Sequence, residues 1–492
     1  MARRGSLLTS RAATTMSGIS LGRVTTVLLF SRALGVPLGL LNAVVLARSL
    51  GVDRLGIYSY AMGVAALFAL LPNLGISTIV ARSIAREPET SGGVVRAAIF
   101  AQLLLAGGVF ALILGFTAIL PGQPVPLGYV ALAAGQLAVG TLSWPYLAII
   151  GGRARYDRLA VAEFVAACAG TAGTLVAAAM RGGVTTFLLA HLFASSLAVL
   201  AARHIARPHF PLKDRERIGL GRLLRQTAPL GATAAVQSLY TRLDIVMLGQ
   251  LASRTALGLY SAAYKPVNMA VYFGSTISGP LLPLMAQPPP QGAPVAFWRA
   301  MRLLGVAGPA FGLACTGLAD VLLRLLFGTE YVPASLMLII LAWSASINWL
   351  YTPLGISLQA RGHERIWLVG SIASLALNAG GNLWAIPRWE GLGAAASTLF
   401  SETALLAFGT AFVWRRLAIV PSWRPILAGV AATAAGAAVL MTLNGLGALL
   451  ATGAALVVYG SLLFAFRVVT REDVTLVAGW LREAVGALSR GR

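Results

Sequence analysis

The sequence predicts an all-α integral membrane protein of about fourteen transmembrane helices, arranged as two six-helix lobes related by a parallel repeat, plus a C-terminal helix pair. First, 58% of its residues are apolar and only 11% are charged, which is far from the composition of a soluble globular protein. Second, the apolar residues form runs of about 20 or more, long enough to cross a bilayer as helices. These runs lack the period-two alternation of a membrane β-barrel. Third, one short segment occurs twice, at matching places in the two halves.

The apolar runs are the predicted spans. Spans one to six form an N-lobe at 24–203, spans seven to twelve form a C-lobe at 226–420, and spans thirteen and fourteen form an appended pair at 424–469. In order, the fourteen ranges are 24–48, 57–81, 94–120, 127–150, 159–180, 184–202, 226–250, 257–285, 298–318, 332–356, 366–387, 391–414, 424–443 and 446–468.

Three polar segments flank and join the lobes. Residues 1–23 are basic and lack a compact apolar core followed by a small-residue cleavage site, so we expect a retained cytoplasmic tail and not a signal peptide. Residues 204–225 form a basic linker between the lobes. Residues 470–492 carry apolar side chains three and four positions apart, which predicts an amphipathic cytoplasmic helix lying against membrane lipids.

The distribution of basic residues predicts the orientation. If the N-terminal tail is cytoplasmic, 29 of the 38 lysines and arginines fall in the inner segments and six in the outer loops. Cytoplasmic loops of membrane proteins carry this excess, so both termini are expected inside the cell. The net charge of +22 therefore reflects orientation in a membrane, and we expect no nucleic-acid partner.

The repeated segment is Leu55-Gly-Ile-Tyr-Ser-Tyr-Ala61, which returns as Leu257-Gly-Leu-Tyr-Ser-Ala-Ala263 with five of seven positions identical. The offset of 202 residues superimposes span one on span seven and span two on span eight. Two explanations fit this match. It is either a coincidence in a low-complexity apolar sequence, or a parallel repeat about an axis along the membrane normal, which some transporters use to rock two lobes around a central site.

Several classes of activity are disfavoured, and we expect no enzyme. The chain has no Gly-x4-Gly-Lys-Ser/Thr phosphate-binding loop, and its four histidines have no metal-ligand spacing. No nucleophile, base and carboxylate form a catalytic set. The outer loops are short, which weakens a membrane glycan polymerase or glycosyltransferase, because such an enzyme needs a polar outer loop to bind its sugar.

Six charged residues within the spans are the candidate functional groups. An unpaired charge in hydrocarbon costs several kcal/mol, so such residues are usually paired or functional. Two interpretations of Asp244 and Lys265 stay open: a neutralised structural pair, or a binding site in which cations line a central cavity and hold an anionic head group such as a phosphate. The acids are Glu163, Asp244 and Glu402, and the bases that would hold the head group are Arg32, Arg242 and Lys265.

Glu402 and Asp244 are the candidate coupling or gating groups. Glu402 lies in the middle of its span, where Asn378 and Asn382 of the preceding span could face it as part of a cation or proton site, or of a hydrogen-bonded clamp between helices. Apolar surroundings favour the uncharged carboxyl group, which suits Glu402 to proton exchange. Asp244 has basic neighbours and is expected to act as a gate or ion-pair partner. We expect H+ or Na+ as the coupling ion, no further cofactor and no metal site.

Motifs along the chain resemble a known family. Leu46-Ala-Arg-Ser-Leu-Gly51 and Leu55-Gly-Ile-Tyr-Ser59 in the first half, with Arg242-Leu-Asp244 and Leu326-Phe-Gly328 followed by Tyr331 in the second, are similar to the polysaccharide-transporter branch of a larger superfamily. That superfamily also holds multidrug and toxin extruders and murein-precursor flippases. The resemblance covers most of residues 24–420, and its specificity lies in the order and spacing of the motifs.

The resemblance implies a flippase for polyprenyl-diphosphate-linked oligosaccharides in the bacterial inner membrane, working by alternating access and driven by an ion gradient. It also implies glycan polymerases and glycosyltransferases as partners in the same pathway. Val36-Pro-Leu-Gly39 stands where murein-precursor flippases continue with Arg and Asp, which argues against a peptidoglycan role. Residues 21–50 contain no acid, unlike the first span of proton-coupled drug extruders. A multidrug or cation antiporter is the alternative.

Overall fold

The computed structural model of the chain is a bundle of helices. It describes residues 21–73, 75–120, 122, 124–211, 221, 239, 242–278, 285, 293–417, 423–443, 445 and 447–469. Within these ranges the regular elements are helices, and nine stretches are long and apolar enough to cross a membrane. The prediction of an all-α membrane protein is therefore confirmed. The predicted tails at 1–23 and 470–492, the linker and the first part of the span at 226–250 lie wholly or largely outside the described residues.

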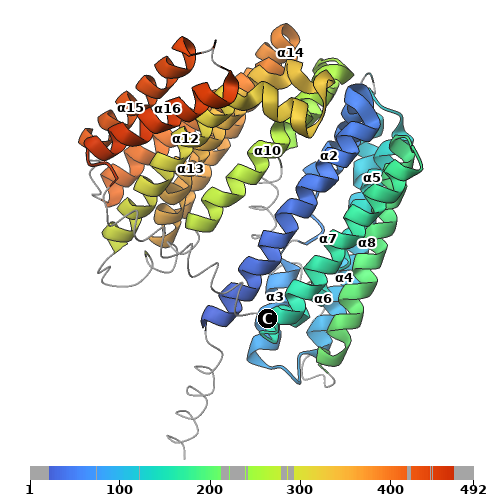
Figure 1. Cartoon of the computed structure of the whole chain (residues 1–492). Coiled ribbons are helices and arrows are strands. Elements are labelled where there is room, and N and C mark those ends of the chain that lie inside the picture. Colours follow the sequence, from blue (N-terminus) through green and yellow to red (C-terminus); the bar gives the residue numbers. More distant parts are fainter. Residues whose placement is uncertain are drawn as a thin grey trace, which may run out of the picture.

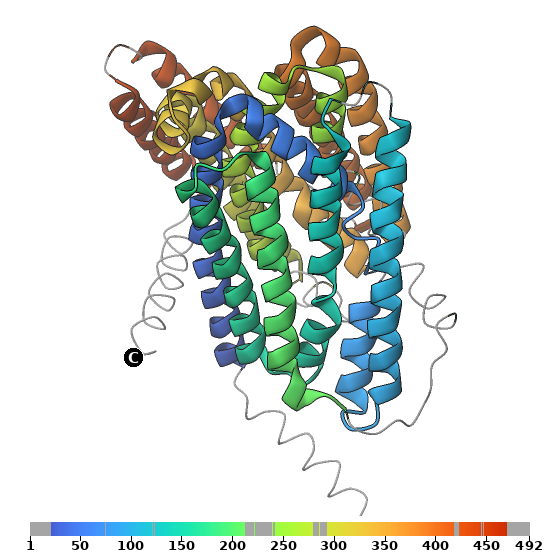
Figure 2. The same ribbon diagram turned by 90° about the vertical axis from the view of Figure 1, so that its right-hand side faces the viewer.

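The N-lobe is a set of helices packed around α2 and α8 (Figures 1 and 2). It consists of α2 (Leu21–Leu67), α3 (Ile76–Arg86), α4 (Gly92–Ile119), α5 (Leu127–Thr141), α6 (Trp144–Gly152), α7 (Tyr156–Ala179), α8 (Val184–Ala206) and the short η1 (Arg207–His209).

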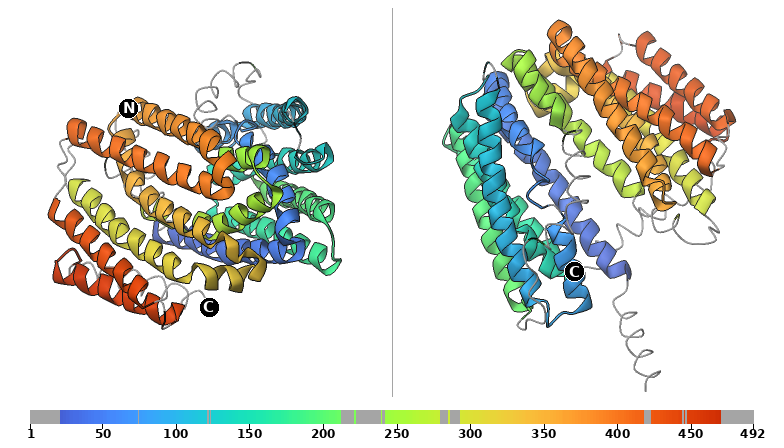
Figure 3. Two further views of the ribbon diagram at one scale, coloured as in Figure 1. Left: turned by 90° about the horizontal axis from the view of Figure 1, so that it is seen from above. Right: turned by 180° about the vertical axis from the view of Figure 1, so that it is seen from behind.

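The C-lobe faces the N-lobe across α10, and the last two helices lie on the far side of the C-lobe (Figure 3). It consists of the helical segment 242–251, α10 (Arg254–Ser278), α12 (Ala293–Leu326), η2 (Thr329–Ala334), α13 (Ser335–Ala360) and α14 (Glu364–Leu417). The pair is α15 (Trp423–Thr442) and α16 (Ala448–Ala465), which pack against each other and against α12. Tyr459 of α16 donates a hydrogen bond to the Val306 carbonyl of α12 at 2.9 Å.

Two of the long helices each contain two predicted spans joined by a sharp kink. α2 bends at Gly51, where φ is 72°, and α14 bends at Glu390, where φ is 48°. Glycine adopts this left-handed region at little cost, so the kink in α2 is built into the sequence.

Other predicted spans are interrupted. The span at 57–81 ends as α2 at Leu67 and resumes as α3 at Ile76. Asn73, just before the new helix, satisfies one amide of its first turn, because its side-chain oxygen accepts a hydrogen bond from the Ser77 amide at 3.1 Å. Gly75, with φ of 83°, completes the turn. The span at 127–150 is likewise divided into α5 and α6, and Pro145 stands in the first turn of α6, where its missing N–H costs nothing.

The apolar core shows how the two lobes meet. We call the end at which α2 begins the inner end, and the end with the Gly51 kink the outer end. One large buried cluster at the outer end combines both lobes, including Leu50, Tyr60, Leu257 and Tyr331. Toward the inner end each lobe has its own cluster, around Ile84 and Val95 in the N-lobe and around Phe297 and Leu358 in the C-lobe. The lobes are therefore joined at the outer end and packed separately at the inner end, as Figures 1 and 3 also show.

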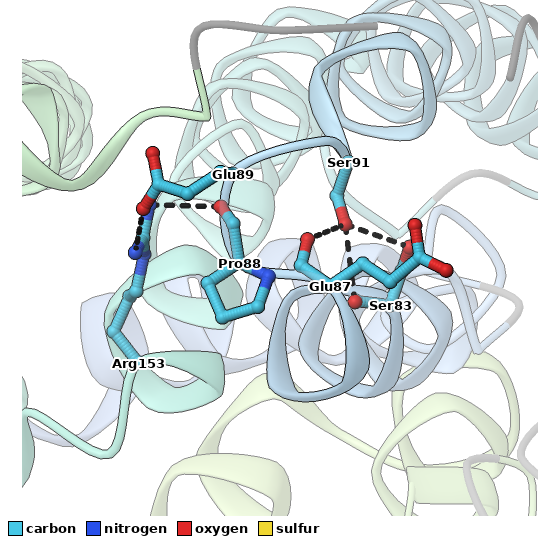
Figure 4. Close-up of polar contacts among 6 residues, drawn as sticks. All are labelled: Ser83, Glu87, Pro88, Glu89, Ser91 and Arg153. Carbon is cyan, nitrogen blue, oxygen red and sulfur yellow. Dashed lines mark hydrogen bonds and ion pairs between the residues drawn. The ribbon is translucent and has the colours of Figure 1, made fainter. Parts of the chain in front are cut away.

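The inner end of the N-lobe is held by polar contacts in the turn between α3 and α4 (Figure 4). Ser91 donates to the Ser83 carbonyl at 3.0 Å and to the Glu87 carbonyl at 2.5 Å. Arg153, at the end of α6, forms an ion pair with Glu89 at 2.8 Å. The Arg153–Glu89 ion pair joins the α3–α4 turn to the α6–α7 turn.

Candidate functional site

The repeated segments form the contact that closes the outer end. α2 and α10 approach so closely there that a Cβ atom on Gly56 would lie 2.2 Å from the Arg254 carbonyl oxygen, and one on Gly258 would lie 2.0 Å from the Val52 carbonyl oxygen. Because Arg254 is 202 residues after Val52 and Gly258 is 202 residues after Gly56, the two contacts are reciprocal. Only glycine permits backbones to approach this closely, so the matching glycines make the closure possible.

Polar contacts between the lobes reinforce this closure. Thr255 donates to Asp53 at 2.5 Å, and these two residues are also 202 positions apart. Arg48 donates to the Leu326 carbonyl at 2.9 Å, and Tyr331 donates to the Ala47 carbonyl at 2.8 Å. The motif residues around Leu46–Gly51, Leu55–Ser59 and Leu326–Tyr331 thus lie where the two lobes meet.

Two of the three predicted head-group ligands lie in the C-lobe without an acidic partner. Arg242 and Lys265 are half-buried and lie close enough to repel each other electrostatically. Lys265 also acts electrostatically on His191 of α8, so it faces the opposite lobe. Neither side chain has a hydrogen-bond or ion-pair partner within the described part of the chain. Arg32 lies on α2, but its side chain is outside the described residues.

The pairing of Asp244 with Lys265 is wrong. Asp244 is buried, with 9% of its surface exposed, and it is held by neutral donors. Tyr260 of α10 donates to Oδ2 at 3.0 Å, Thr398 of α14 donates to the same oxygen at 2.8 Å, and Asn382 of α14 donates to Oδ1 at 2.8 Å. The hydrogen bonds replace the ion pair, because helical rotation points the carboxylate toward α14.

Oxygen atoms surround Asp244 beyond these three donors. The Asn382 amide also donates to the Asn378 side-chain oxygen at 3.0 Å, and the Asn378 amide approaches the Thr398 hydroxyl at 3.4 Å. The Asn382 side-chain oxygen is buried and has no hydrogen-bond partner. A buried acceptor without a partner costs about 1–3 kcal/mol. A cation bound beside Asp244 would satisfy this oxygen, and oxygen ligands with one negative charge suit a hard cation such as sodium.

Glu402 lies one turn after Thr398 on α14 and is buried, with 7% of its surface exposed. Its partners come from α13: the Ser344 hydroxyl donates to Oε2, and the Tyr351 hydroxyl donates to Oε1 at 3.3 Å. Asn378 and Asn382, which were expected to face Glu402, face Asp244 instead. Within the described residues Glu402 has no ion-pair partner.

The third predicted intramembrane acid, Glu163, is exposed on α7. It takes no part in either cluster.

The sequence did not indicate several residues that complete these clusters. Tyr260, Thr398, Ser344 and Tyr351 come from separate helices, and their spacing carries no motif. The sequence did contain one signal for a second cluster, in the N-lobe. The repeat spacing of 202 residues makes Asn42 the equivalent of Asp244, and Tyr58 the equivalent of Tyr260.

Comparison with known proteins identifies relatives over most of the chain. A family described as "Polysaccharide biosynthesis protein" matches residues 21–288. The "probable low-salt glycan biosynthesis flippase Agl15" of Haloferax volcanii is 21% identical over 399 residues, which covers 78% of this chain and 81% of that protein.

The fold is similar to those of solved transporters. The lipid II flippase MurJ in an inward closed conformation matches with a TM-score of 0.69 and 13% identity, over 89% of this chain and 98% of that chain. An inward-facing multidrug resistance MATE family transporter of the MOP superfamily matches with a TM-score of 0.60 and 14% identity, over 80% of this chain and 98% of that chain. An outward-facing structure of such a transporter matches less well, with a TM-score of 0.53.

Proposed function

The chain belongs to the polysaccharide biosynthesis protein family, and from this premise we propose that it moves a polyprenyl-diphosphate-linked oligosaccharide across the bacterial inner membrane by alternating access. The resemblance of the sequence motifs and the glycan flippase relative support this substrate class. The joined outer end and the separate inner ends correspond to one state of such a cycle. The other state would require the reciprocal glycine contact to open.

The observation that carries the proposal is the pair Arg242 and Lys265 of the C-lobe, which have no ion-pair partner among the described residues and of which Lys265 lies within electrostatic range of His191 in the N-lobe. Two half-buried positive charges that repel each other destabilise the protein unless a bound anion or another function compensates for the repulsion. A diphosphate supplies two adjacent negative charges, an arginine binds phosphate oxygens through its planar fork, and a lysine does so as a point charge. The lipid-linked diphosphate would thus offset the repulsion.

The test is translocation of a labelled lipid-linked oligosaccharide in reconstituted vesicles, measured as the fraction that becomes accessible to an added glycosidase. Lys265→Ala and Arg242→Ala should slow translocation by about 10- to 100-fold, because each loses a charged hydrogen bond of about 1.5–3 kcal/mol. Lys265→Arg should retain part of the activity. Arg324→Ala removes an exposed cation of the same lobe and should leave the rate unchanged. Wild-type rates in both alanine variants would contradict the assignment of these residues to the head group.

Ion coupling is the second part of the proposal. Asp244, Asn378, Asn382 and Thr398 are the residues that would hold a sodium ion, and the partnerless Asn382 oxygen supports this assignment. The bound ion would compensate the buried carboxylate. Glu402, which has the Ser344 and Tyr351 hydroxyls as partners and no ion-pair partner among the described residues, is proposed to exchange a proton. Asp244 is bound by Thr398 of α14, and Glu402 lies one turn after Thr398 on the same helix, so we expect a change of charge at either carboxyl group to alter the packing of α14 against its neighbours.

The multidrug antiporter is the competing function, because the MATE transporters share the fold. A drug antiporter of this kind binds organic cations. Arg242 and Lys265 would repel such substrates, so transport of an organic cation such as ethidium, competing with the lipid-linked glycan, would favour this alternative.

A further inference from the structure

The N-lobe contains a buried polar cluster that matches the Asp244 cluster of the C-lobe residue by residue. Asn42 is 202 residues before Asp244, and Tyr58 is 202 residues before Tyr260. The other two members, Thr174 of α7 and His191 of α8, precede Asn382 and Thr398 of α14 by 208 and 207 residues. Helices α2, α7 and α8 pack against one another, as Figure 1 shows, and the cluster lies where they meet.

The contacts of this cluster form one continuous chain. The Tyr58 hydroxyl lies 2.7 Å from His191 Nδ1, the Thr174 hydroxyl lies 2.8 Å from His191 Nε2, and the same hydroxyl donates to the Asn42 side-chain oxygen at 2.7 Å. His191 is 8% exposed and Thr174 is fully buried. Both ring nitrogens of His191 therefore have a partner inside the lobe.

The number of available hydrogens assigns the direction of each bond. Thr174 has one hydroxyl hydrogen, and the Asn42 side-chain oxygen and the Gly170 carbonyl at 3.1 Å are both acceptors for it, so the hydroxyl oxygen accepts a hydrogen bond from Nε2–H of His191. A neutral imidazole then has a bare Nδ1, which accepts from the Tyr58 hydroxyl. This series of hydrogen bonds is complete only when His191 is neutral. A proton added to the Nδ1 lone pair would force the Tyr58 hydroxyl to turn and find another acceptor.

The two clusters differ in charge at one position. The C-lobe has a carboxylate, Asp244, where the N-lobe has the neutral Asn42, and the N-lobe has an imidazole where the C-lobe has the Thr398 hydroxyl. A cation bound in the C-lobe and a proton on His191 would place one positive charge at equivalent sites of the two lobes. Histidine is the residue whose ordinary titration lies near physiological pH.

We propose that His191 is a further coupling group beside Asp244 and Glu402, and that it binds one proton at the site of the N-lobe that is equivalent to the Asp244 site. The proposal rests on the transport function proposed above. Tyr58 follows Gly56 of the outer closure by two residues on α2, and its hydroxyl contacts His191 of α8, so its reorientation would act on the part of α2 that contacts α10. Proton uptake at His191 would in this way be linked to the opening of the outer end.

Lys265 links the same group to the substrate. It acts on His191 across the interface between the lobes, and two positive charges oppose each other. Tyr58 of α2 is the other titratable group that faces the imidazole, α7 contributes the non-titrating Thr174, and among the described residues α5 and α6 bring no charged group that acts on it. A diphosphate bound at Lys265 would offset the repulsion, so substrate and proton should bind cooperatively.

The first test is nitrogen NMR of the full-length protein in nanodiscs with labelled histidines, and His191→Gln identifies the signal. We expect the His191 ring to gain one proton reversibly when the pH is lowered from about 8 to about 4. Its midpoint should move to higher pH when inorganic pyrophosphate is added, and the Lys265→Ala variant should show the higher midpoint without pyrophosphate. A ring that stays neutral over this range, or a midpoint that is the same in wild type and Lys265→Ala, would overturn the proposal.

The second test is transport. His191→Gln in reconstituted vesicles should lose the acceleration caused by an imposed proton gradient and keep its dependence on sodium. His204→Gln changes an exposed histidine of the same helix and should behave as wild type. Tyr58→Phe keeps the ring and removes the hydroxyl, so it should shift the NMR midpoint even if His191→Gln does not fold. If wild-type protein fails to move the lipid-linked glycan while His191 still titrates with Lys265-dependence, the transport function falls and the proton site stands.

Discussion

The reciprocal glycine contact allows a quantitative prediction for the change Gly258→Ala. In the closed state the new Cβ would lie 2.0 Å from the Val52 carbonyl oxygen, whereas ordinary contacts of this kind begin between 3.0 and 3.4 Å. Because the obstacle is backbone, α2 and α10 must separate by about 1 to 1.4 Å. Overpacking of this kind costs about 1–3 kcal/mol. The penalty applies only when the lobes are joined at the outer end, so it should shift the population away from that state by about 5- to 150-fold.

The distance between spin labels measures this shift. Labels at Ile119 of the N-lobe and at Met441 of the appended pair, both exposed near the outer end, should report a longer distance in Gly258→Ala than in wild type. Gly56→Ala should have the same effect, because its Cβ would meet the Arg254 carbonyl oxygen at 2.2 Å. The double variant should cost less than the sum of the two, since one separation of the lobes relieves both contacts.

Gly39→Ala is the matched control, because no atom lies within 4 Å of the position of its Cβ. Gly39→Ala also gains the helix stability of about 0.5–1 kcal/mol that alanine has over glycine, so it controls for that effect without the clash. The reasoning would be refuted by a distance distribution in Gly258→Ala that matches those of wild type and Gly39→Ala.

The remaining predictions concern orientation, coupling and the inner surface. A reporter fused at Arg207 and one at the C-terminus should both indicate the cytoplasm, and a cysteine at Pro124 should react from outside; termini on opposite sides would contradict the fourteen-span topology. Asp244→Asn should abolish the dependence of transport on a sodium gradient, whereas Glu402→Gln should abolish the response to a proton gradient; an unchanged proton response in Glu402→Gln would remove that residue as a proton carrier. A hydrogen bond from Arg155 lowers the pKa of Asp157 to about 2. The stability that this bond adds is therefore present above about pH 4 and is lost as the pH falls toward 2. Both partners are exposed, so Asp157→Asn should change the Tm at pH 7 by less than about 2 °C, and a larger fall would show that the contact is more important than its exposure suggests.

The sequence by itself determined the architecture, because the relevant signals are local. The length of each apolar run specifies a membrane helix, since the bilayer core has a fixed thickness. The spacing of 202 residues between the Leu-Gly-x-Tyr-Ser segments identified the repeat, and those segments lie at the contact between the lobes. Even the kink at Gly51 falls in a predicted link, because glycine is the residue that adopts its backbone angles readily.

Only the tertiary structure decided which groups meet inside the lobes. One of the two interpretations of the sequence paired Asp244 with Lys265 across a short hairpin, but Asp244 is bound by Asn382 and Thr398, which are 138 and 154 residues away. Successive residues of a helix point in directions about 100° apart, so the rotation of each helix about its own axis selects the partner. That rotation depends on packing against helices remote in sequence. For the same reason His191, which has no informative neighbours in the sequence, is joined to Tyr58 from 133 residues away.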